Sequence, residues 1–242
     1  MTCILRLDEL CKAFGAVKVA DQQSYEVTQG EALGVIGPNG AGKTSMFNLI
    51  TGTMAPDSGQ ITFDGEDITA WSAARRSRSG IARSFQVPQP FTHMTVFENA
   101  MVAATQAADL SGHAAEVHCL QVLKDTGLLA KANTPAGKLT LLERKRLELT
   151  RALCTKPKLL LLDEIAGGLT EGECVSLVET IKAIHASGVT IIWIEHVVHA
   201  LLAVVDRLIV IDFGRKIAEG APKETMASRE VQEIYLGIEA DA

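Results

Sequence analysis

The stretch "GVIGPNGAGKTSMFNLI", residues 34–50, decides the fold because it joins an apolar run to a glycine-rich turn and then to an amphipathic segment. Gly37 and Gly42 stand at the two ends of the turn, and Lys43 and Thr44 follow at once. Gly-x-x-x-x-Gly-Lys-Thr between a strand and a helix is the pattern of a phosphate-binding loop, or P-loop. We therefore expect a P-loop here and a chain that binds a nucleoside triphosphate.

The residue types of this loop indicate how it would hold the phosphates. Small residues let successive backbone N–H groups turn inward, and the following helix points its positive N-terminus at the same place. Lys43 is expected to reach the β- and γ-phosphates of ATP, and the Thr44 hydroxyl is expected to ligate Mg²⁺. The alternative is a chance match in a glycine-rich turn, which the flanking strand and helix patterns disfavour.

Acidic residues end a second apolar run, "KLLLLDE", residues 158–164. Asp163 fits the acid that supports Mg²⁺, and Glu164 could orient or deprotonate the attacking water. Alone, the pair would be two surface acids at a strand end; beside a P-loop the functional interpretation is favoured. The run at 189–195 is followed by His196, which places an imidazole at the same sheet edge. A lone histidine is usually structural or exposed, but this one could contact the γ-phosphate.

Strand-sized apolar runs alternate with helical patterns along most of the chain, which predicts an α/β fold. Runs without polar alternation suit strands buried on both faces of a parallel sheet. The clearest helical pattern covers 171–187, and Thr170 with Glu173 forms a capping box at its start. The four apolar runs are residues 31–37, 158–164, 189–195 and 207–212.

Two regions differ from this alternation. Residues 4–35 and 60–63 read as short strands with turn residues, which predicts an antiparallel sheet that precedes or flanks the main one. The segment 95–153 reads as helical throughout and suggests an inserted subdomain. The expected fold is an α/β P-loop NTPase core with an N-terminal antiparallel β subdomain and an inserted α-helical subdomain. We expect a single domain over 1–242, with the core and β subdomain in 1–87 and 155–242 and the helical subdomain in about 92–154.

The composition is that of a soluble globular protein: 242 residues, 47% hydrophobic, 21% charged and a net charge of −6. This acidic balance argues against a nucleic-acid partner, because proteins that bind nucleic acids normally carry a stripe of basic residues on their surface. Five scattered cysteines without a C-x-x-C pair support neither disulfides nor a zinc site, and they suit a reducing compartment. Neither a signal segment nor an apolar run long enough to span a bilayer is apparent.

For three weaker signals, a structural interpretation is favoured over a functional one. Arg75, Arg76 and Arg78 are expected to form a solvated helix face. His196 and His199 have a spacing that can hold a metal, but no third ligand follows at a suitable distance. The "DFG" at 212–214 lacks the catalytic loop of a kinase and is predicted to be a hairpin turn.

With these motifs in place, the whole chain resembles the ATP-binding subunit of an ABC transporter. "GPNGAGKTS" matches the family's Walker A and "LLLLDE" its Walker B, with Glu164 as the catalytic glutamate. His196 matches the switch histidine, and Gln86 in "RSFQVPQPF" matches the Q-loop glutamine. Phe14 occupies the position of the aromatic residue that stacks on adenine, although an ordinary core phenylalanine is the competing interpretation. The loop residues that this resemblance assigns to the nucleotide are Gly37, Pro38, Asn39, Gly40, Ala41, Gly42, Lys43, Thr44 and Ser45.

The resemblance also implies cofactors, roles and partners. ATP and Mg²⁺ would be bound, with Thr44, Gln86 and Asp163 near the ion and Asp163 acting through water; Gln86 would also sense the attacking water. The helical block would dock on coupling helices of transmembrane permease subunits, at the cytoplasmic face of the inner membrane. A second ATPase subunit, the same or different, would complete the site, and a solute-binding protein would act indirectly.

Within the family, the strongest likeness is to the importers of branched-chain amino acids. It rests on "MTVFENAMVAA", "KRLELTRALCTKPKLLLLDE" and the tail "GRKIAEGAPKETMASREVQEIYLG". Other members remain open alternatives: an importer of urea or aromatic acids, an exporter, or a weakly catalytic regulatory subunit.

The family's signature segment, L-S-x-G-Q, is altered here to Leu139-Thr140-Leu141-Leu142-Glu143. Its T-x-x-E is a capping box, so a helix N-terminus with free N–H groups and the Thr140 hydroxyl is expected to remain for the partner's γ-phosphate. The leucines take the place of small residues, and Glu143 adds a negative charge. This predicts an asymmetric pair: a competent half-site in this chain, completed by a partner's signature, and a weaker one where this segment serves the partner. The alternative is that Thr140 and the helix N-terminus suffice.

Overall fold

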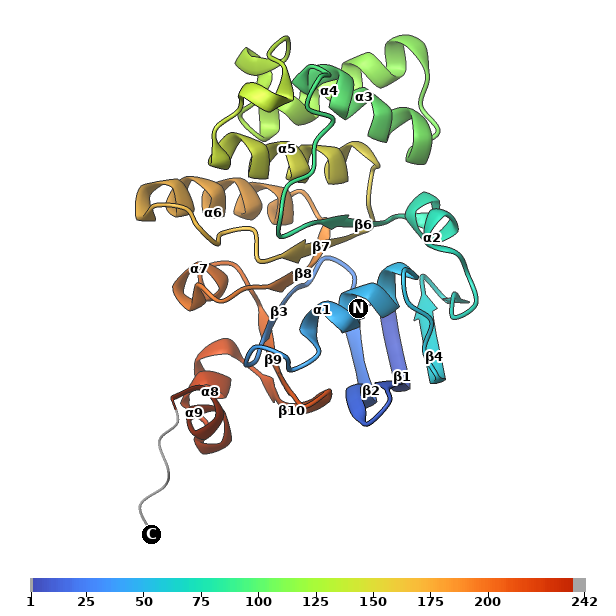
Figure 1. Ribbon diagram of the computed structural model, residues 1–242, viewed down its shortest axis with the longest axis vertical. Coiled ribbons are helices and arrows are strands. Elements are labelled where there is room, and N and C mark those ends of the chain that lie inside the picture. Colours follow the sequence, from blue (N-terminus) through green and yellow to red (C-terminus); the bar gives the residue numbers. More distant parts are fainter. Residues whose placement is uncertain (1, 237–242) are drawn as a thin grey trace.

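The computed structural model describes residues 2–236 and shows two sheets, with helices around and above them (Figure 1). The larger sheet has the strand order β10-β9-β3-β8-β7-β6. Its central strands pair in parallel, and β10 pairs antiparallel with β9 at the edge. The strands are β3 (Ala32–Ile36), β6 (Ile81–Ser84), β7 (Leu159–Asp163), β8 (Thr190–Ile194), β9 (Arg207–Asp212) and β10 (Arg215–Gly220).

All four apolar runs of the sequence are strands of this sheet, as predicted. Every residue of β3, β7 and β8 is buried, because helices or the second sheet cover both faces. One face packs on α1 (Lys43–Thr51) and the smaller sheet, and the other on α6 (Glu171–Ala186) and α7 (Val198–Leu202). The P-loop and Asp163 consequently meet at the carboxyl ends of β3 and β7, which lie on either side of β8, at the edge of the sheet where ligands bind in such folds.

The smaller sheet is antiparallel, with the order β2-β1-β4-β5, which agrees with the predicted N-terminal β subdomain. The prediction of short strands is wrong for its two main members. β1 (Cys3–Phe14) and β2 (Val17–Thr28) form one long hairpin with several irregularities of register, and β4 (Ser58–Phe63) and β5 (Glu66–Asp67) complete the sheet. Bulges break the regular alternation of side chains along a strand, and this is why the sequence pattern predicts several short strands in place of two long ones.

The predicted helical block is present, and it lies above the sheet in Figure 1. It contains α3 (Val96–Ala107), α4 (Gly112–Asp125) and α5 (Leu141–Cys154), with two short 3₁₀ turns between α4 and α5. Two small apolar clusters, one of which includes the buried thiols of Cys119 and Cys154, hold the helices together.

One arginine of the predicted solvated cluster is buried instead. Arg76, on α2 (Ala73–Ser79), is 1% exposed and donates hydrogen bonds to the carbonyls of Leu49 and Ile50 at 2.6 and 3.0 Å. These carbonyls lie in the last turn of α1, where a cation satisfies unpaired acceptors. The helix behind the P-loop is therefore fixed from its far end.

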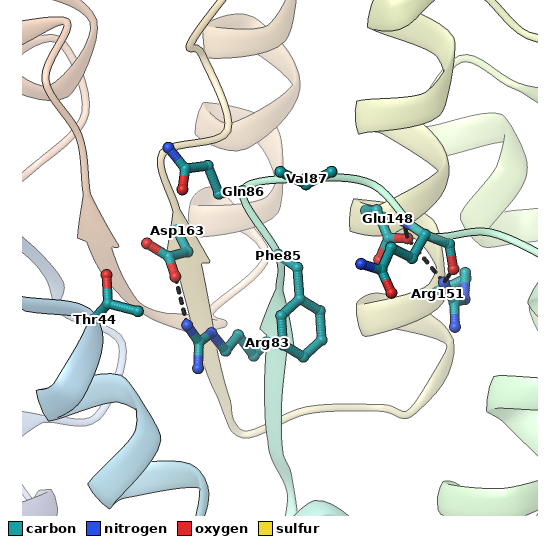
Figure 2. Close-up of a pocket in the computed structure, with 9 residues that line it drawn as sticks. Thr44, Arg83, Phe85, Gln86, Val87, Glu148, Arg151 and Asp163 are labelled. Carbon is teal, nitrogen blue, oxygen red and sulfur yellow. Dashed lines mark hydrogen bonds and ion pairs between the residues drawn. The ribbon is translucent and has the colours of Figure 1, made fainter. Parts of the chain in front are cut away.

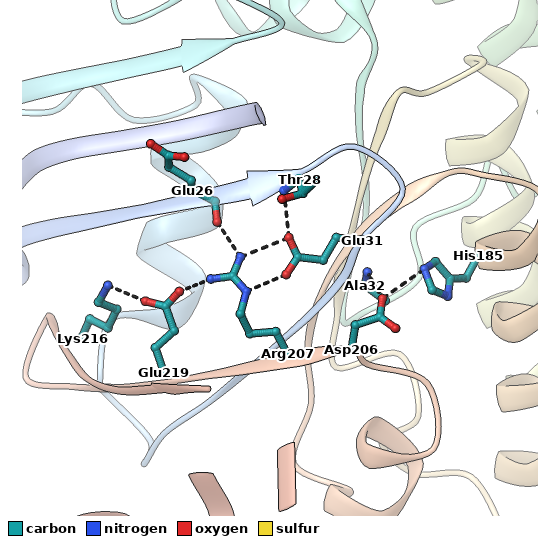
Figure 3. Close-up of polar contacts among 9 residues, drawn as sticks. All are labelled: Glu26, Thr28, Glu31, Ala32, His185, Asp206, Arg207, Lys216 and Glu219. Carbon is teal, nitrogen blue, oxygen red and sulfur yellow. Dashed lines mark hydrogen bonds and ion pairs between the residues drawn. The ribbon is translucent and has the colours of Figure 1, made fainter. Parts of the chain in front are cut away.

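Arg207 joins the two sheets through a partly buried network (Figure 3). Its guanidinium, at the start of β9, contacts the Glu31 carboxylate at 2.6 and 3.1 Å and the Glu26 carbonyl oxygen at 2.6 Å, and it also pairs with Glu219. A planar fork of donors suits such a junction, because several acceptors can be reached at once.

The remaining segments agree with the sequence or add to it. Phe213 lies at the hairpin turn between β9 and β10, as predicted for "DFG". The chain continues into α8 (Pro222–Ala227) and α9 (Arg229–Leu236), while the last residue of the quoted tail, Gly237, falls outside the described residues. Within residues 2–236, no helix is both long and apolar enough to cross a membrane.

Candidate nucleotide site

The P-loop follows β3 and depends on glycine at two places. Gly42, the N-cap of α1, has φ +101°, and a Cβ there would lie 2.2 Å from the carbonyl oxygen of Val19. A Cβ on Gly37 would lie 2.0 Å from the carbonyl oxygen of Ile211. Only glycine permits this conformation and this close approach of backbone to backbone. Neither a side-chain cap nor an acidic residue occurs at the start of α1, so this helix N-terminus is open to an anion.

Lys43 turns back over the loop that it follows. Its ammonium donates hydrogen bonds to the carbonyl oxygens of Gly37 at 2.6 Å and Pro38 at 2.9 Å. Burial lowers the pKa of Lys43, while the carboxylates of Glu164 and Asp163 act in the opposite direction. The Lys43 ammonium thus bonds to neutral carbonyl oxygens, which are weaker acceptors for it than charged phosphate oxygens would be.

Asp163 ends β7 beside Thr44, and both residues line one cavity with Gln86 (Figure 2). The Asp163 carboxylate is 3% exposed and accepts a hydrogen bond of 2.5 Å from Arg83 on β6. Burial raises the pKa of Asp163, and the neighbouring Arg83 guanidinium opposes that shift. A hydroxyl, a carboxylate and an amide oxygen are the hard oxygen ligands that Mg²⁺ prefers, so this donor set fits the ion.

The three residues predicted to be catalytic meet around one carboxylate. Glu164 Oε1 lies 2.6 Å from His196 Nε2, and its Oε2 accepts a hydrogen bond from the side-chain amide of Gln86. Glu164 has φ +47°, an uncommon conformation for a residue with a side chain. Such strained positions cluster at active sites, where the surrounding structure fixes them. The acid, the imidazole and the amide come from three different loops.

Two buried charges behind Glu164 were missed by the sequence analysis. Glu195 is 1% exposed, and its carboxylate accepts hydrogen bonds from the backbone N–H groups of Ala166, His196 and Val197. It therefore ties the loop after Glu164 to the loop that carries His196. Lys145, on α5, is 4% exposed, and its ammonium lies 3.4 Å from the carbonyl oxygen of Glu164. Buried charges are rare and need partners, but nothing local in the sequence marks these two as buried.

The segment after Gln86 is fastened to α5 by another missed pair, visible in Figure 2. Glu148 accepts hydrogen bonds of 2.8 Å from the backbone N–H of Gln89 and from Arg151, which in turn donates to the Gln89 carbonyl at 3.0 Å. Because α5 begins in the signature-like segment, this pair links that helix directly to the loop of Gln86.

The signature-like segment forms the predicted capping box, but it is less open than expected. Thr140 is the N-cap of α5; its hydroxyl accepts from the N–H of Glu143 at 3.4 Å, and the Glu143 carboxylate accepts from the N–H of Thr140 at 2.9 Å. Lys131 also contacts that carboxylate at 3.2 Å. Leu142 is partly buried against the core, whereas Leu141 is 45% exposed. The N–H groups of Thr140 and Glu143 are thus used within the capping box itself, whereas the role of this helix N-terminus at the partner's γ-phosphate stays a prediction.

Phe14, at the end of β1, is 54% exposed, which argues against the core interpretation and leaves its ring accessible. Among the hydrogen bonds of residues 2–236, none joins Phe14 or Thr140 to the P-loop, so their assignment to the nucleotide stays a prediction. In the same part of the chain, no cluster of three or more His, Cys, Asp or Glu is placed to hold a metal, and this includes the surroundings of His199.

A P-loop after a buried strand, an acid pair at the end of another strand of the same parallel sheet and a histidine beside Glu164 define a P-loop nucleotide hydrolase. Comparison with known proteins narrows this class. Residues 20–167 match the ABC transporter family. The chain is 32% identical to the high-affinity branched-chain amino acid transport ATP-binding protein BraF of Pseudomonas aeruginosa, over 97% of this chain and 98% of that protein. The chain belongs to the ABC transporter family and is an ABC-type ATPase subunit.

Other relatives show how widely this fold is shared. The lipopolysaccharide export system ATP-binding protein LptB of Escherichia coli K12 is 31% identical over 96% of this chain and 97% of its own length. The crystal structure of the ADP conformation of an ATP-binding cassette of an ABC transporter superposes with a TM-score of 0.89 at 32% identity, covering 98% of this chain and all of the other. These findings confirm the predicted family, fold class and type of enzyme, whereas the roles of individual residues remain predictions.

Proposed function

We propose that this chain binds and hydrolyses ATP to energise the uptake of branched-chain amino acids or related small solutes. One observation carries the proposal: Glu164 is held by His196 and Gln86 beside an open P-loop, in a chain similar to BraF over nearly its whole length. A carboxylate placed in this way can act on a water molecule that attacks the terminal phosphate.

Each polar group of the site has a distinct task. Lys43 and the backbone N–H groups of the loop bind the phosphates, and Phe14 offers its exposed ring to the adenine. Thr44, Asp163 and Gln86 are placed to hold Mg²⁺, which when bound neutralises charge on the phosphate oxygens. The Glu164 carboxylate accepts a proton from the attacking water.

His196 then has a positioning task in this scheme. Its Nε2 keeps one oxygen of Glu164 in place, and the imidazole would also contact the γ-phosphate of bound ATP. The Gln86 amide holds the other carboxylate oxygen, so that Glu164 cannot rotate freely.

The proposed partners are a second ATPase subunit, transmembrane permease subunits and, indirectly, a solute-binding protein, with the chain peripheral to the cytoplasmic face of the inner membrane. We also propose the division into a core with its β subdomain, 1–87 and 155–242, and a docking helical subdomain, about 92–154; residues 1 and 237–242 lie outside the described structure. The tie between Glu148 and the segment after Gln86 supports a mechanical link between the helical subdomain and the site.

One alternative is an ATPase of a different ABC transporter, such as an exporter, and the similarity to LptB supports it. Another is a weakly catalytic regulatory subunit, which the altered signature-like segment supports. Purification of the complex from native membranes separates these alternatives, because the subunits that accompany the chain differ in each.

A titration of the purified chain with Mg·ATP tests the proposal most directly. We expect saturable binding, and we expect Lys43→Met to weaken it by roughly 10- to 100-fold, because a charged hydrogen-bond donor to phosphate contributes about 1.5–3 kcal/mol. Lys138→Met, at an exposed lysine, is the matched control. If neither the chain alone nor the complex binds Mg·ATP, the proposed function is wrong.

A further inference from the structure

Arg83 is the least expected charge in the site, because it comes from the middle of a short strand. Its side chain is 8% exposed, and its guanidinium bonds to two acceptors, of which Figure 2 shows Asp163. One nitrogen, Nη2, donates to Asp163 Oδ2 at 2.5 Å; the other, Nη1, donates to Asn48 Oδ1 at 2.6 Å. The two acceptors lie on different elements, the end of β7 and the middle of α1.

These two elements carry the predicted magnesium ligands. Asp163 ends β7, and Thr44 lies in the first turn of α1, one helical turn before Asn48. A side chain that bonds to both elements fixes the spacing between the carboxylate and the hydroxyl. Only one oxygen of Asp163 is used, since among the described residues Oδ1 accepts no hydrogen bond.

The surroundings of Arg83 keep the guanidinium in this place. The ring centroids of Phe85 and Phe47 lie 5.0 and 5.5 Å from its central carbon, within the range of cation–π attraction. Its Nε has no hydrogen-bond partner among residues 2–236. The contacts that hold the side chain in its buried position are therefore those with Asp163, Asn48 and the two rings. A buried donor is left unpaired only where other contacts outweigh the cost.

We propose that Arg83 is a positioning residue that holds the Asp163 carboxylate in register with Thr44 for the magnesium ion of Mg·ATP. The inference rests on the proposed function. Arginine is required because its rigid fork can bond to Asp163 and Asn48 together, whereas the single ammonium of lysine preserves the charge but not both bonds. Groups that orient a metal-binding side chain contribute to metal affinity without touching the metal.

The test measures ATP binding by isothermal titration calorimetry at a series of Mg²⁺ concentrations and, separately, in EDTA. For Arg83→Lys we expect the Mg²⁺ concentration at half-maximal effect to rise roughly 10-fold, and for Arg83→Met at least as much, as is usual for loss of a group that orients a metal ligand. Affinity for ATP in EDTA should stay unchanged. Arg229→Lys, at an arginine on α9 that is 77% exposed and, among residues 2–236, pairs only with Glu233, is the matched control and should match the wild type.

The outcomes separate this inference from the function on which it rests. If the wild type binds Mg·ATP but both Arg83 variants keep its Mg²⁺ dependence within about twofold, the inference alone is overturned. An equal loss of affinity with and without Mg²⁺ also overturns it, because a general structural defect would explain the result. The lysine variant keeps the assay informative if the methionine variant does not fold. A wild type that fails to bind Mg·ATP overturns the proposed function itself.

Discussion

Two helix N-termini of this chain have the same backbone chemistry but differ in what occupies them. α1 begins at Gly42, without a capping side chain and without an acid in its first turn. α5 begins at Thr140 with a complete capping box, in which the Glu143 carboxylate accepts a hydrogen bond from the N–H of Thr140. The N-terminus of α1 is therefore open to an anion, whereas the N-cap of α5 already bonds to a carboxylate of the same chain.

The difference shows that a helix N-terminus is an anion site only if the protein leaves it unoccupied. Unpaired N–H groups and the helix dipole attract a nearby negative charge, and a glutamate three residues after the N-cap supplies one at α5 but not at α1. At α5, Lys131 also pairs with that carboxylate and helps to hold it in place. The asymmetric pair stays a prediction, and the charge of Glu143 beside the exposed side chain of Leu141 is the feature of this chain that would weaken the partner's site.

The largest expected effect is at the open terminus. Glu164→Gln, measured in the assembled complex, should lower ATP turnover by about 10²- to 10⁴-fold while nucleotide binding persists, because the general base is lost and the shape is kept. Glu179→Gln, the same change on the exposed face of α6, serves as the control. A loss of less than about 10-fold would show that Glu164 is not the general base. It would also contradict the prediction that the P-loop of this chain belongs to the competent half-site.

An intermediate effect is expected at the closed terminus. Glu143→Gln keeps the capping geometry but removes the charge, and in the dielectric of water one such repulsion at about 4 Å is worth about 1 kcal/mol, or about fivefold in rate. Turnover of the complex should rise by up to that factor. Glu98→Gln, in the matching capping box of α3, should change nothing. If Glu143→Gln leaves turnover at the wild-type level, charge does not limit the second site.

The smallest effect concerns the pH dependence of stability. The N–H of Thr140, assisted by Lys131, lowers the pKa of Glu143 below its ordinary value of 4.5. Since the folded pKa is the lower one, the ionised carboxylate stabilises the fold above 4.5, and this contribution is lost as the pH falls through the folded value. The difference in unfolding free energy between wild type and Glu143→Gln, from urea titrations, should therefore be constant at neutral pH and shrink in acid.

The capping box of α3 offers the comparison for that measurement. The Thr95 N–H lowers the pKa of Glu98 in the same way, so Glu98→Gln should show the same direction of change. A difference that widens in acid for Glu143→Gln would mean that its carboxylate is not the group that caps α5.

Much of the fold could be predicted because its signals are local. The P-loop, the four buried strands and the capping boxes at Thr140 and Thr170 each depend on residues within one turn or one strand of each other. The catalytic candidates Glu164 and His196 could be placed at one sheet edge because parallel strands end together. The long hairpin was misread because its bulges hide the two-residue period.

The sequence by itself determined most of the strands and helices, the position of the P-loop and the family to which the chain belongs. Only the tertiary structure decided how the charges pair. Arg83 meets Asp163 across 80 residues, and Arg76 turns out to be buried against α1 rather than solvated. The same holds for Glu143, whose capping role is local but whose partner Lys131 is brought to it by the fold. A sequence motif contains only residues that are close together in the chain, whereas the partner of a buried charge depends on which distant elements pack together.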